Sequence, residues 1–501
     1  MRILTANQIK QVEERAFKSG FTEEGLMKCA GTACFNKIIK HYENDMQNKK
    51  VGVVCGNGKN AGDGFVIASL LCERGIDASI VLADKKPTLP EPLLYFNEAR
   101  DNGVEIISFD SDNFDYDFVV DCIFGIGFKG EPRPPFSAVF DTINKSGATV
   151  IAIDTPSGTN ATTGEALNAV KADLTIAIST LKFAHVLPPA NEYCGRTVTV
   201  NIGIPENCYD NDYANTITKS QVKSCFAPRP VNSHKGTFGH QLNICGSYLM
   251  SGAAVICAKA SLKTGVGLLK CAFPKSIYPV MTSHLIQPIF KPLCENESKT
   301  LSIGGINDIL DELKWADSVA IGCGLGNNDD TQVIVGQVIK TSEVPVVLDA
   351  DGINAISLFI DIIKDKKAPL VITPHPAEMA RLIGEDIAYV QSNRIDVSKA
   401  FAKENNVIVV LKGANTVVTD GKDVFVNTTG NSGMAMGGTG DMLTGMIASF
   451  IAQGIEPFEA SKCAVYIHGL CGDITAGEIS KAGMTVEDML SLLGALMSEF
   501  E

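Results

Sequence analysis

Two series of short apolar runs, separated by segments with helical spacing, constrain the fold of this 501-residue chain more than any other feature. The runs occupy residues 51–55, 78–82, 104–107, 118–122, 149–153, 174–178 and 197–202 in the first half, and 241–245, 319–321, 346–348, 370–373 and 407–411 in the second. Short buried strands that alternate with helices are typical of parallel sheets covered on both faces. The sequence therefore predicts an α/β fold whose N-terminal part is a Rossmann-like doubly wound sheet.

The length and one break in this alternation predict two domains. A chain of this size exceeds what one ordinary hydrophobic core accommodates. A polar stretch at 207–220, followed by Pro228 and Pro230, interrupts the strand–helix series. We expect tandem α/β domains at 1–216 and 217–501, with a leading helix at 6–17 packed on the first sheet.

Charge and cysteine usage exclude several classes of partner. A net charge of −14 argues against a general binder of nucleic acids or anionic membranes. The 15 cysteines contain no Cys-x-x-Cys pair, which favours reduced thiols in a cytoplasmic protein over a disulfide framework. We see no secretion signal and no apolar run of membrane-spanning length, so we expect a cytoplasmic protein without a membrane or nucleic-acid partner.

A glycine-rich segment near the C-terminus points to phosphate chemistry. Residues 431–441 read Asn-Ser-Gly-Met-Ala-Met-Gly-Gly-Thr-Gly-Asp and lead into an apolar stretch typical of a buried helix. Glycines let several N–H groups approach an anion, and the positive end of the helix dipole adds to this attraction. Asp441 would repel phosphates, but it suits a base that removes a hydroxyl proton. The segment predicts phosphoryl transfer to an alcohol; the alternative is an ordinary glycine-rich helix start.

Four other strand ends of the second half carry site-like residues. They are Gly322 to Gly326, Asp349 to Asn354, Thr373 to Glu378 and Lys412 to Thr416. Ligands of open α/β sheets bind beyond the carboxyl ends of the strands, so these ends should converge. Each has a simpler alternative: a plain turn, helix caps at Asp349 and Asp351, a loop histidine at 375 and a surface charge at 412.

From His234 onward, these pieces in their order resemble the ADP/ATP-dependent NAD(P)H-hydrate dehydratases of the ribokinase-like superfamily. The resemblance implies Asp441 as the base and a hydrated-nicotinamide site at Ala253, Gly324, Gly326, His375, Pro376, Ala377, Glu378, Met379, Ala380, Arg381 and Asp441. It implies a nucleotide site at Lys412, Gly413, Ala414, Asn415, Thr416, Asn431, Ser432, Gly433, Met434, Ala435, Met436, Gly437, Gly438, Thr439 and Gly440. Met436 departs from the threonine expected there.

The implied reaction explains why a kinase-like site would catalyse a dehydration. Asp441 deprotonates the ring hydroxyl, which attacks the terminal phosphoryl group of ADP or ATP. Phosphate, unlike hydroxide, is then a good leaving group. Mg²⁺ on the phosphates is expected from general phosphoryl-transfer chemistry, and the fused architecture favours ADP by resemblance only.

The first half has its own cluster of polar strand ends. The segment 55–64 reads Cys-Gly-Asn-Gly-Lys-Asn-Ala-Gly-Asp-Gly, a glycine-rich loop without the usual dinucleotide spacing and, taken alone, often only a turn. Asn60, Asp121 and Ser157 could offer hard oxygen ligands to a cation, and Asp154 and Lys129 are candidates for proton transfer.

Residues 6–203 resemble the NAD(P)H-hydrate epimerase domain of YjeF type. The resemblance implies K⁺ on Asn60, Asp121 and Ser157, and a substrate site at Lys59, Asn60, Ala61, Gly62, Asp63, Gly125, Ile126, Gly127, Phe128, Lys129, Gly130, Glu131 and Asp154. Lys59 and Ala61 depart from the asparagine and glycine that the family usually carries. The tandem order resembles bifunctional NAD(P)H-hydrate repair enzymes. The resemblance implies interconversion of R- and S-NAD(P)HX and dehydration of the S form. Ribokinase-like dehydratases tend to self-associate, so we also expect a homo-oligomer.

Two other functions fit part of the sequence. A kinase for a small alcohol, such as a vitamin precursor, would use Asp441 and the glycine-rich segment equally well, but it would release a phosphorylated product. The first domain could also be a nucleotide-binding or scaffold module without activity. The joint presence of Asn60, Asp121, Asp154 and Ser157 disfavours the scaffold.

Overall fold

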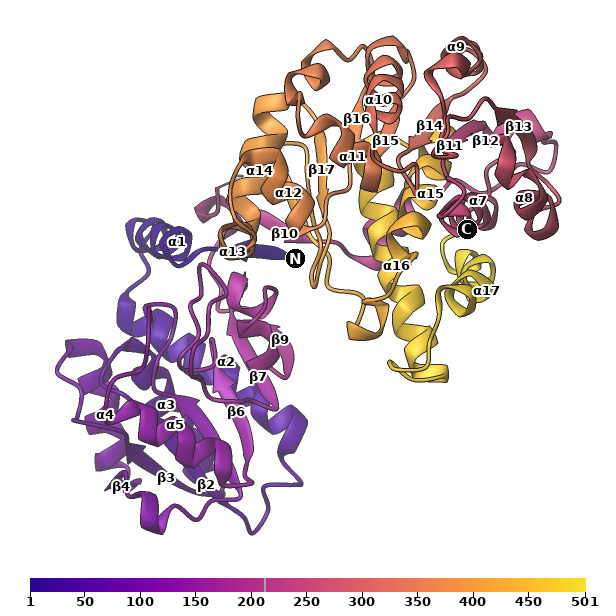
Figure 1. Cartoon of the computed structure of the whole chain (residues 1–501). Helices are drawn as coiled ribbons and strands as arrows, with labels where there is room; N and C mark the ends of the chain where they lie inside the picture. The colour runs from indigo at the N-terminus through magenta and orange to yellow at the C-terminus, as the bar shows by residue number, and fades with distance from the viewer. Residues whose placement is uncertain (211–212) are drawn as a thin grey trace. The chain divides into compact units, whose positions relative to one another are not determined.

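The structure is a computed structural model that describes residues 1–210 and 213–501. It divides the chain into two compact units, Met1–Ala214 and Asn215–Glu501 (Figure 1). Each unit is a layered arrangement of helices around a largely parallel sheet, which confirms the predicted α/β class.

Unit 1 is built on a seven-stranded, all-parallel sheet. The strand order is β4 (Glu105–Ser108), β3 (Asp77–Leu82), β2 (Lys50–Cys55), β5 (Phe118–Cys122), β6 (Thr149–Ile153), β7 (Leu174–Ile178) and β9 (Arg196–Val200). The side chains on its two faces pack in separate apolar clusters, because successive side chains of a strand point to opposite sides. Val53 packs with helices α2 (Glu23–Tyr42), α3 (Lys59–Glu73) and α4 (Pro90–Asp101), and Val54 packs with α5 (Phe136–Lys145). The sheet is therefore doubly wound.

The leading helix does not pack where the sequence suggested. Helix α1 (Ala6–Lys18) lies against β1 (Arg2–Leu4), which pairs in parallel with the short strand β8 (Leu181–Lys182). Its buried residues Val12 and Ala16 join a small cluster with Leu26 and Cys208, outside the sheet core. The sheet face is covered instead by α2, a helix that the pattern of apolar runs did not predict.

The glycine-rich segment after β2 is also different from the prediction. Only Gly56 to Gly58 form a loop, and α3 begins at Lys59. A Cβ atom on Gly62 would lie 2.1 Å from Sδ of Met27, and one on Gly31 would lie 2.6 Å from Cβ of Val66. These glycines allow α2 and α3 to pack closely, so part of the glycine signal reports helix packing rather than a ligand loop.

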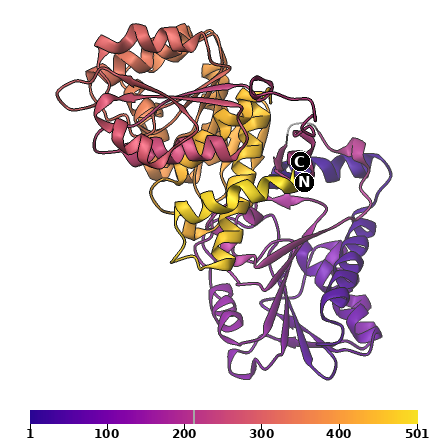
Figure 2. The ribbon, with the colours of Figure 1, turned by 90° about the vertical axis from the view of Figure 1, so that its right-hand side faces the viewer.

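Unit 2 contains a larger sheet between helices on both sides (Figure 2). Its strands run in the order β13 (Ile289–Leu293), β12 (Leu268–Pro274), β11 (His240–Ile244), β14 (Ser318–Ile321), β15 (Val346–Leu348), β16 (Leu370–Ile372), β17 (Ile408–Leu411), β18 (Val417–Thr419) and β19 (Val424–Val426). The pairs from β13 to β17 are parallel, and β18 and β19 add antiparallel strands at the far end. Strand β10 (Ala214–Thr216) lies at the division between the units.

The helices of unit 2 fall into two groups. The main apolar cluster joins the sheet to α6 (Lys219–Ser224), α7 (Ser251–Lys263), α8 (Tyr278–His284), α15 (Thr439–Ala452), α16 (Pro457–Glu478) and α17 (Val486–Leu496). The remaining helices are α9 (Ile306–Leu313), α10 (Asp329–Thr341), α11 (Ala350–Ile356), α12 (Pro376–Ile383), α13 (Ile387–Ser392) and α14 (Arg394–Asn405). The apolar run after Asp441 is the central helix α15, whose residues from Met442 to Ala452 are all buried. Within the described residues, no helix is long and apolar enough to cross a membrane.

Candidate functional site

A cavity of about 820 Å³ opens at the carboxyl ends of β2, β5, β6 and β7 in unit 1. Nine of the predicted epimerase residues line it: Lys59, Asn60, Asp63, Gly125, Ile126, Gly127, Phe128, Lys129 and Asp154. Four others do not: Ala61 and Gly62 are buried between helices, and Gly130 and Glu131 are exposed. The fold thus brings most of this predicted set to one hollow.

Asp154 is the centre of a buried polar cluster in this cavity. Its backbone has a positive φ of 69°, which a non-glycine residue rarely adopts. The Asp154 carboxylate accepts a hydrogen bond from Nζ of Lys182, a residue that is 1% exposed. Nζ also donates to the carbonyl oxygen of Ile178 at 2.7 Å. Asp154 is therefore held as one half of a buried ion pair.

His185 supports this pair from behind. Its Nδ1 accepts from the backbone N–H of Lys182 at 2.9 Å, so Nε2 carries the proton and donates to the carbonyl oxygen of Asp154 at 2.7 Å. Burial, with a contribution from the Lys182 charge, lowers the pKa of His185 to about 4. A neutral imidazole with both nitrogens occupied fixes the backbone on both sides of the ion pair.

Four further acidic residues line the same cavity, and the pKa values of two of them are raised. Burial is the largest cause that raises the pKa of Asp63 well above its usual range, and the charge of Asp154 adds to it. Burial also raises the pKa of Glu13 on α1. Lys59 forms an ion pair with Glu23, so its charge is shared with this carboxylate rather than left for a ligand.

The three predicted cation ligands meet around the backbone of Phe124. Ser157 Oγ donates to Oδ1 of Asp121 at 2.6 Å and lies 3.3 Å from the carbonyl oxygen of Phe124. Asn60 Nδ2 donates to the carbonyl oxygens of Phe124 and Ile153, at 3.1 and 3.3 Å. Burial raises the pKa of Asp121 to about 6, against the opposing hydrogen bonds from Ser157. The set is made entirely of hard oxygen and amide groups.

Unit 2 has a buried ion pair at the corresponding place on its own sheet. Lys412 Nζ donates to Oδ1 of Asp349 at 2.6 Å, and the hydroxyls of Thr373 and Thr444 donate to the two Asp349 oxygens at 2.7 and 2.8 Å. Burial alone would raise the pKa of Asp349, but Lys412 and the two hydroxyls outweigh it, so that pKa lies below its usual value. Asp349 precedes α11 without capping it through its side chain.

Asp441 lies beside this pair in the first turn of α15. Burial, followed by the neighbouring Cys323 and Asp349, raises the pKa of Asp441 to about 9, while Lys412 opposes the shift. A Cβ atom on Gly440 would lie 3.4 Å from Lys412 Nζ and 3.7 Å from Oδ2 of Asp349. The glycine-rich turn therefore lies directly over the ion pair, with Gly438 at φ 96° where the helix begins.

The earlier part of this segment is fixed to α16. Asn431 Nδ2 donates to Oδ1 of Asp473 at 3.0 Å, and Asn431 Oδ1 accepts from the N–H of Gly433 at 2.9 Å. The side chains of Met434 and Met436 pack against the main apolar cluster. This part of the turn has a defined shape because side chains anchor it.

The segment 375–381 forms the start of α12. His375 caps the helix, with Nδ1 accepting from the N–H of Ala377 at 3.1 Å, while Glu378 Oε2 accepts from the N–H of His375 at 2.7 Å. Met379 and Ala380 are buried, and Arg381 donates to Oδ1 of Asn354 at 2.5 Å. A small cavity of about 250 Å³ is lined by Asn327, Asn354, Ser357, Leu358 and Arg381.

The remaining predicted residues lie at two other strand ends. A Cβ atom on Gly324 would lie 2.9 Å from Cβ of Ala253, so these two are neighbours, and the N–H of Gly326 donates to Asp351 at 2.8 Å. In the turn 412–416, Gly413 and Asn415 have φ angles of 136° and 59°. The other predicted residues belong to the segments 375–381, 412–416 and 431–441: Pro376, Ala414, Ser432, Ala435, Gly437 and Thr439.

Comparison with known proteins identifies both halves of the chain. Residues 242–493 match the family model described as NAD(P)H-hydrate dehydratase, and residues 23–184 match that of the YjeF-related protein N-terminus. The bifunctional NAD(P)H-hydrate repair enzyme of Moorella thermoacetica is 32% identical over 100% of this chain and 97% of its own length. The enzyme of the same name from Escherichia coli is 32% identical, over 98% of this chain and 93% of its own. The chain belongs to the bifunctional NAD(P)H-hydrate repair enzymes.

Solved structures agree with this family for the second unit. The ADP/ATP-dependent NAD(P)H-hydrate dehydratase of Bacillus subtilis, co-crystallised with ATP and Mg²⁺, is 29% identical with a TM-score of 0.51. It covers 57% of this chain and 99% of the Bacillus chain. A ribokinase-like superfamily protein of Enterococcus faecalis is 25% identical with a TM-score of 0.52, covering 59% and 99%. The C-terminal part of this family member is therefore ribokinase-like, as predicted.

Sequence reasoning missed two basic residues of this repair-enzyme chain. Lys182, the partner of Asp154, lies four residues after the strand end at Ile178, and this position is the local signal for it. Arg394 is 3% exposed on α14 and donates to the carbonyl oxygens of Leu411 and Lys412, at 3.1 and 3.2 Å. It thereby holds the backbone that presents Lys412, but nothing in its local sequence distinguishes it from a surface arginine.

Proposed function

We propose that the two units act in succession on hydrated nicotinamide nucleotides. Residues 1–216 would interconvert R- and S-NAD(P)HX. Residues 217–501 would convert S-NAD(P)HX and ADP into NAD(P)H, phosphate and AMP, or would use ATP and release ADP. The observation that carries this proposal is the presence, in a chain of this family, of Asp154 in an open cavity and of Asp441 beside a glycine-rich turn.

The chemistry proposed for unit 2 begins at Asp441. Before a nucleotide binds, its raised pKa keeps the carboxyl protonated at neutral pH. Mg²⁺ bound with the phosphates would add positive charge that favours the carboxylate of Asp441, the hard oxygen donor beside the glycine-rich turn. The carboxylate then takes the ring hydroxyl proton as that oxygen attacks the terminal phosphoryl group. The N–H groups of residues 437–440 and Lys412 stabilise the phosphoryl charge.

Loss of phosphate completes the dehydration. Electrons from the ring nitrogen form a carbon–nitrogen double bond as the C–O bond breaks and phosphate leaves. A proton from the neighbouring ring carbon then goes to solvent or to a site carboxylate, and the electrons of that C–H bond form the carbon–carbon double bond while the nitrogen regains its electron pair. Hydroxide would be expelled far more slowly, because its conjugate acid is much weaker. We propose ADP as the preferred nucleotide.

The chemistry proposed for unit 1 uses Asp154 and its ion-pair partner. A proton delivered to the ring hydroxyl lets it leave as water while the ring nitrogen supplies electrons; water then adds to the opposite face and returns a proton. Asp154 is the group that would exchange this proton, and Lys182 holds its carboxylate in place. Lys129, which also lines the cavity, remains a second candidate for proton transfer.

We propose K⁺ as the cation held by Asn60, Asp121 and Ser157. The donor set fits a hard cation, since it offers a carboxylate, a hydroxyl and an amide beside the carbonyl oxygen of Phe124. Rotation of the Asn60 amide would present its oxygen in place of the nitrogen. Bound K⁺ would fix the loop after β5 that forms one wall of the cavity.

We also propose a cytoplasmic homo-oligomer without nucleic-acid or membrane partners. The 15 cysteines are all free thiols, which suits a reducing compartment. Ile286 and Ile289, next to and on the outermost strand β13, are 97% and 45% exposed and would suit contact with a second copy. Light scattering behind gel filtration gives the oligomeric mass directly.

A single absorbance assay tests both activities. Purified protein is given mixed R- and S-NADHX with ADP or ATP, and recovery of NADH is followed. Full recovery at an enzyme-dependent rate is expected. Recovery that stops at the S fraction, apart from slow spontaneous epimerisation, would refute the epimerase, and no recovery with either nucleotide would refute the dehydratase.

A further inference from the structure

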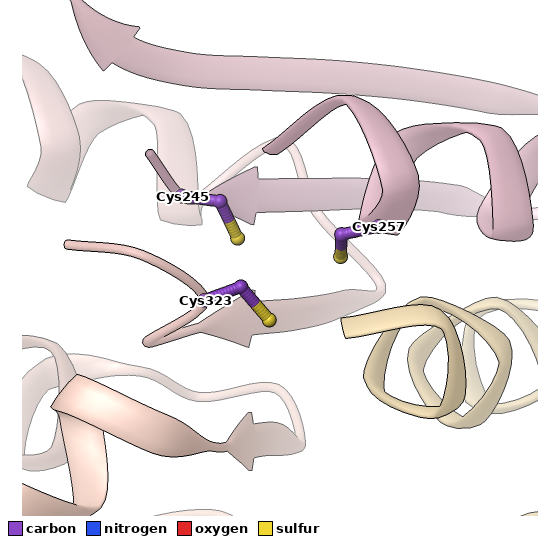
Figure 3. Close-up of side chains that lie close together, drawn as sticks. All are labelled: Cys245, Cys257 and Cys323. Carbon is purple, nitrogen blue, oxygen red and sulfur yellow. The ribbon is translucent and has the colours of Figure 1, made fainter. Parts of the chain in front are cut away.

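Three cysteine thiols meet inside unit 2, and the proposed dehydration does not use them. Cys245 follows β11, Cys323 follows β14 and Cys257 lies on α7, so three separate elements each supply one sulfur. Figure 3 shows the three side chains close together. The three Sγ atoms all lie within 4.8 Å of one another, and each residue is at most 2% exposed. This is a convergent cluster closed off from solvent.

The cluster has the chemistry of a soft-metal site. Zinc–sulfur bonds of about 2.3 Å place the sulfurs of a tetrahedral site about 3.8 Å apart, so small side-chain shifts would close the cluster on an ion. Asn243 Nδ2 lies 3.4 Å from Cys257 Sγ and donates to it, the kind of outer contact that supports a metal-bound thiolate. Hard cations such as Mg²⁺ and K⁺ prefer oxygen, so these thiols would not compete for them.

Cys323 connects this cluster to the site carboxylates. Its Sγ atom and carboxylate oxygens of Asp349 and Asp441 also lie within 4.8 Å of one another. The Asp349 oxygens already accept hydrogen bonds from Lys412, Thr373 and Thr444. Cys323 Sγ also donates to Oδ2 of Asp349 at 3.8 Å, so Asp441 is the carboxylate that these contacts leave to ligate an ion held by the three sulfurs.

We propose that Cys245, Cys257 and Cys323 bind one thiophilic d¹⁰ cation, such as Zn²⁺, Cd²⁺ or Cu⁺, with Asp441 as the oxygen ligand. Each thiol gives up its proton to solvent on binding. The bound cation occupies Asp441 and blocks dehydration, while epimerisation in unit 1 continues. The block rests on the proposed role of Asp441; the binding site does not.

Cadmium binding to the full-length, reduced protein tests the site itself. After gel filtration, elemental analysis gives the Cd²⁺ content, and the sulfur-to-cadmium ultraviolet band reports thiolate ligation. Cys257→Ala should bind one Cd²⁺ fewer per chain than the unsubstituted protein, and Cys245→Ala should behave the same way. Cys271→Ala is the matched control, because Cys271 is an equally buried thiol of the same core outside the cluster. Equal Cd²⁺ content and an equal ultraviolet band in folded Cys257→Ala, Cys245→Ala and Cys271→Ala would overturn the proposal.

Inhibition tests the link to Asp441. Cd²⁺ should inhibit dehydration in the unsubstituted protein and in Cys271→Ala, and the inhibitory concentration should rise at least tenfold in Cys257→Ala. Epimerisation should be unchanged in all three. Inhibition that does not depend on Cys257 would refute the ligation by Asp441. Absence of dehydration without Cd²⁺ would refute the proposed function instead, and the Cd²⁺ content would still decide the site.

Discussion

The two units share one structural feature at their candidate sites, an aspartate–lysine ion pair, but the pair has different neighbours in each unit. Each places a buried aspartate–lysine pair at the carboxyl ends of parallel strands: Asp154 with Lys182 in unit 1 and Asp349 with Lys412 in unit 2. In unit 1 the paired aspartate itself lines a cavity of about 820 Å³. In unit 2 the pair lies beneath Gly440, and the aspartate proposed to react is a third group, Asp441.

The two proposed reacting carboxyl groups, Asp154 and Asp441, therefore differ in what surrounds and stabilises them. Asp154 has a lysine partner, whereas burial keeps Asp441 protonated, with a pKa of about 9. Under the proposed function, a neutral carboxyl does not repel incoming phosphates, and the positive charge that arrives with them favours its ionised form. Under the proposed function, the unit 2 site therefore depends on its nucleotide to form the reacting carboxylate.

The largest expected effect is on the dehydration rate, and it tests whether Asp441, rather than the ion-paired Asp349, is the reacting carboxyl group. Asp441→Asn should lower the dehydration rate by about 10²- to 10⁴-fold, because it removes the base while keeping the shape of the turn. Nucleotide binding, measured by calorimetry, and epimerisation should both persist. A variant that retains full dehydration would show that Asp441 is not the base.

The same variant has a signature in stability. Asp441 has a folded-state pKa near 9 against 3.8 when unfolded, so its contribution is fully present below pH 4 and is lost as pH rises through 9. Asn has no such dependence. The Tm of Asp441→Asn relative to the unsubstituted protein should therefore increase from pH 5 to pH 9. A difference in Tm that stays constant with pH would contradict the raised pKa.

Removing the lysine of unit 1 should affect both stability and epimerisation. Lys182→Met leaves Asp154 as a buried, uncompensated charge, which costs about 3–5 kcal/mol in the free energy of unfolding. Epimerisation should fall steeply and dehydration of supplied S-NADHX should remain in protein that stays folded. Lys10→Met is the matched control, since Lys10 also lines the cavity, has no proposed role in proton transfer and is not part of the Asp154–Lys182 pair. Equal epimerase losses in the two variants would mean that the ion pair has no special role.

A single methyl group tests how closely the turn fits the pair of unit 2. Gly440→Ala places a Cβ atom 3.4 Å from Lys412 Nζ, tighter than most such contacts. The added methyl group occupies the space directly over the ion pair, and we expect about a tenfold loss in dehydration with little change in Tm. Gly437→Ala, whose added Cβ meets nothing within 4 Å, is the control. Similar rates for Gly440→Ala and Gly437→Ala would exclude a close fit.

The smallest expected effect compares one buried histidine from each unit. Burial lowers the pKa of His185 and of His468 to about 4, from 6.5. Unfolded chains bind the proton first as pH falls, so each histidine lowers stability by about 1–3 kcal/mol between pH 6.5 and 4 and has no effect above this range. His468→Gln should flatten the acid side of the unfolding curve for unit 2, and His185→Gln that for unit 1. Unchanged acid slopes would mean that both histidines titrate normally.

The sequence predicted the elements that have a local, periodic pattern of apolar residues. Runs such as 51–55 and 346–348 match β2 and β15 because buried parallel strands are short and continuously apolar. It was less reliable where one residue type serves two purposes. The glycines at 62 and 64 suggested a ligand loop, but they lie inside α3 and make room for Met27 and Cys122.

By itself, the sequence determined the α/β class, the strand ends that carry polar residues and the turn that leads to Asp441. These follow from local periodicity and from glycine's backbone freedom. Only the tertiary structure decided which charges meet. Asp154 finds Lys182 28 residues away, Asp349 finds Lys412 63 residues away, and three thiols converge from separate elements. Such contacts form because the sheet places strand ends that are distant in the sequence side by side, and no short stretch of sequence specifies which strand ends become neighbours.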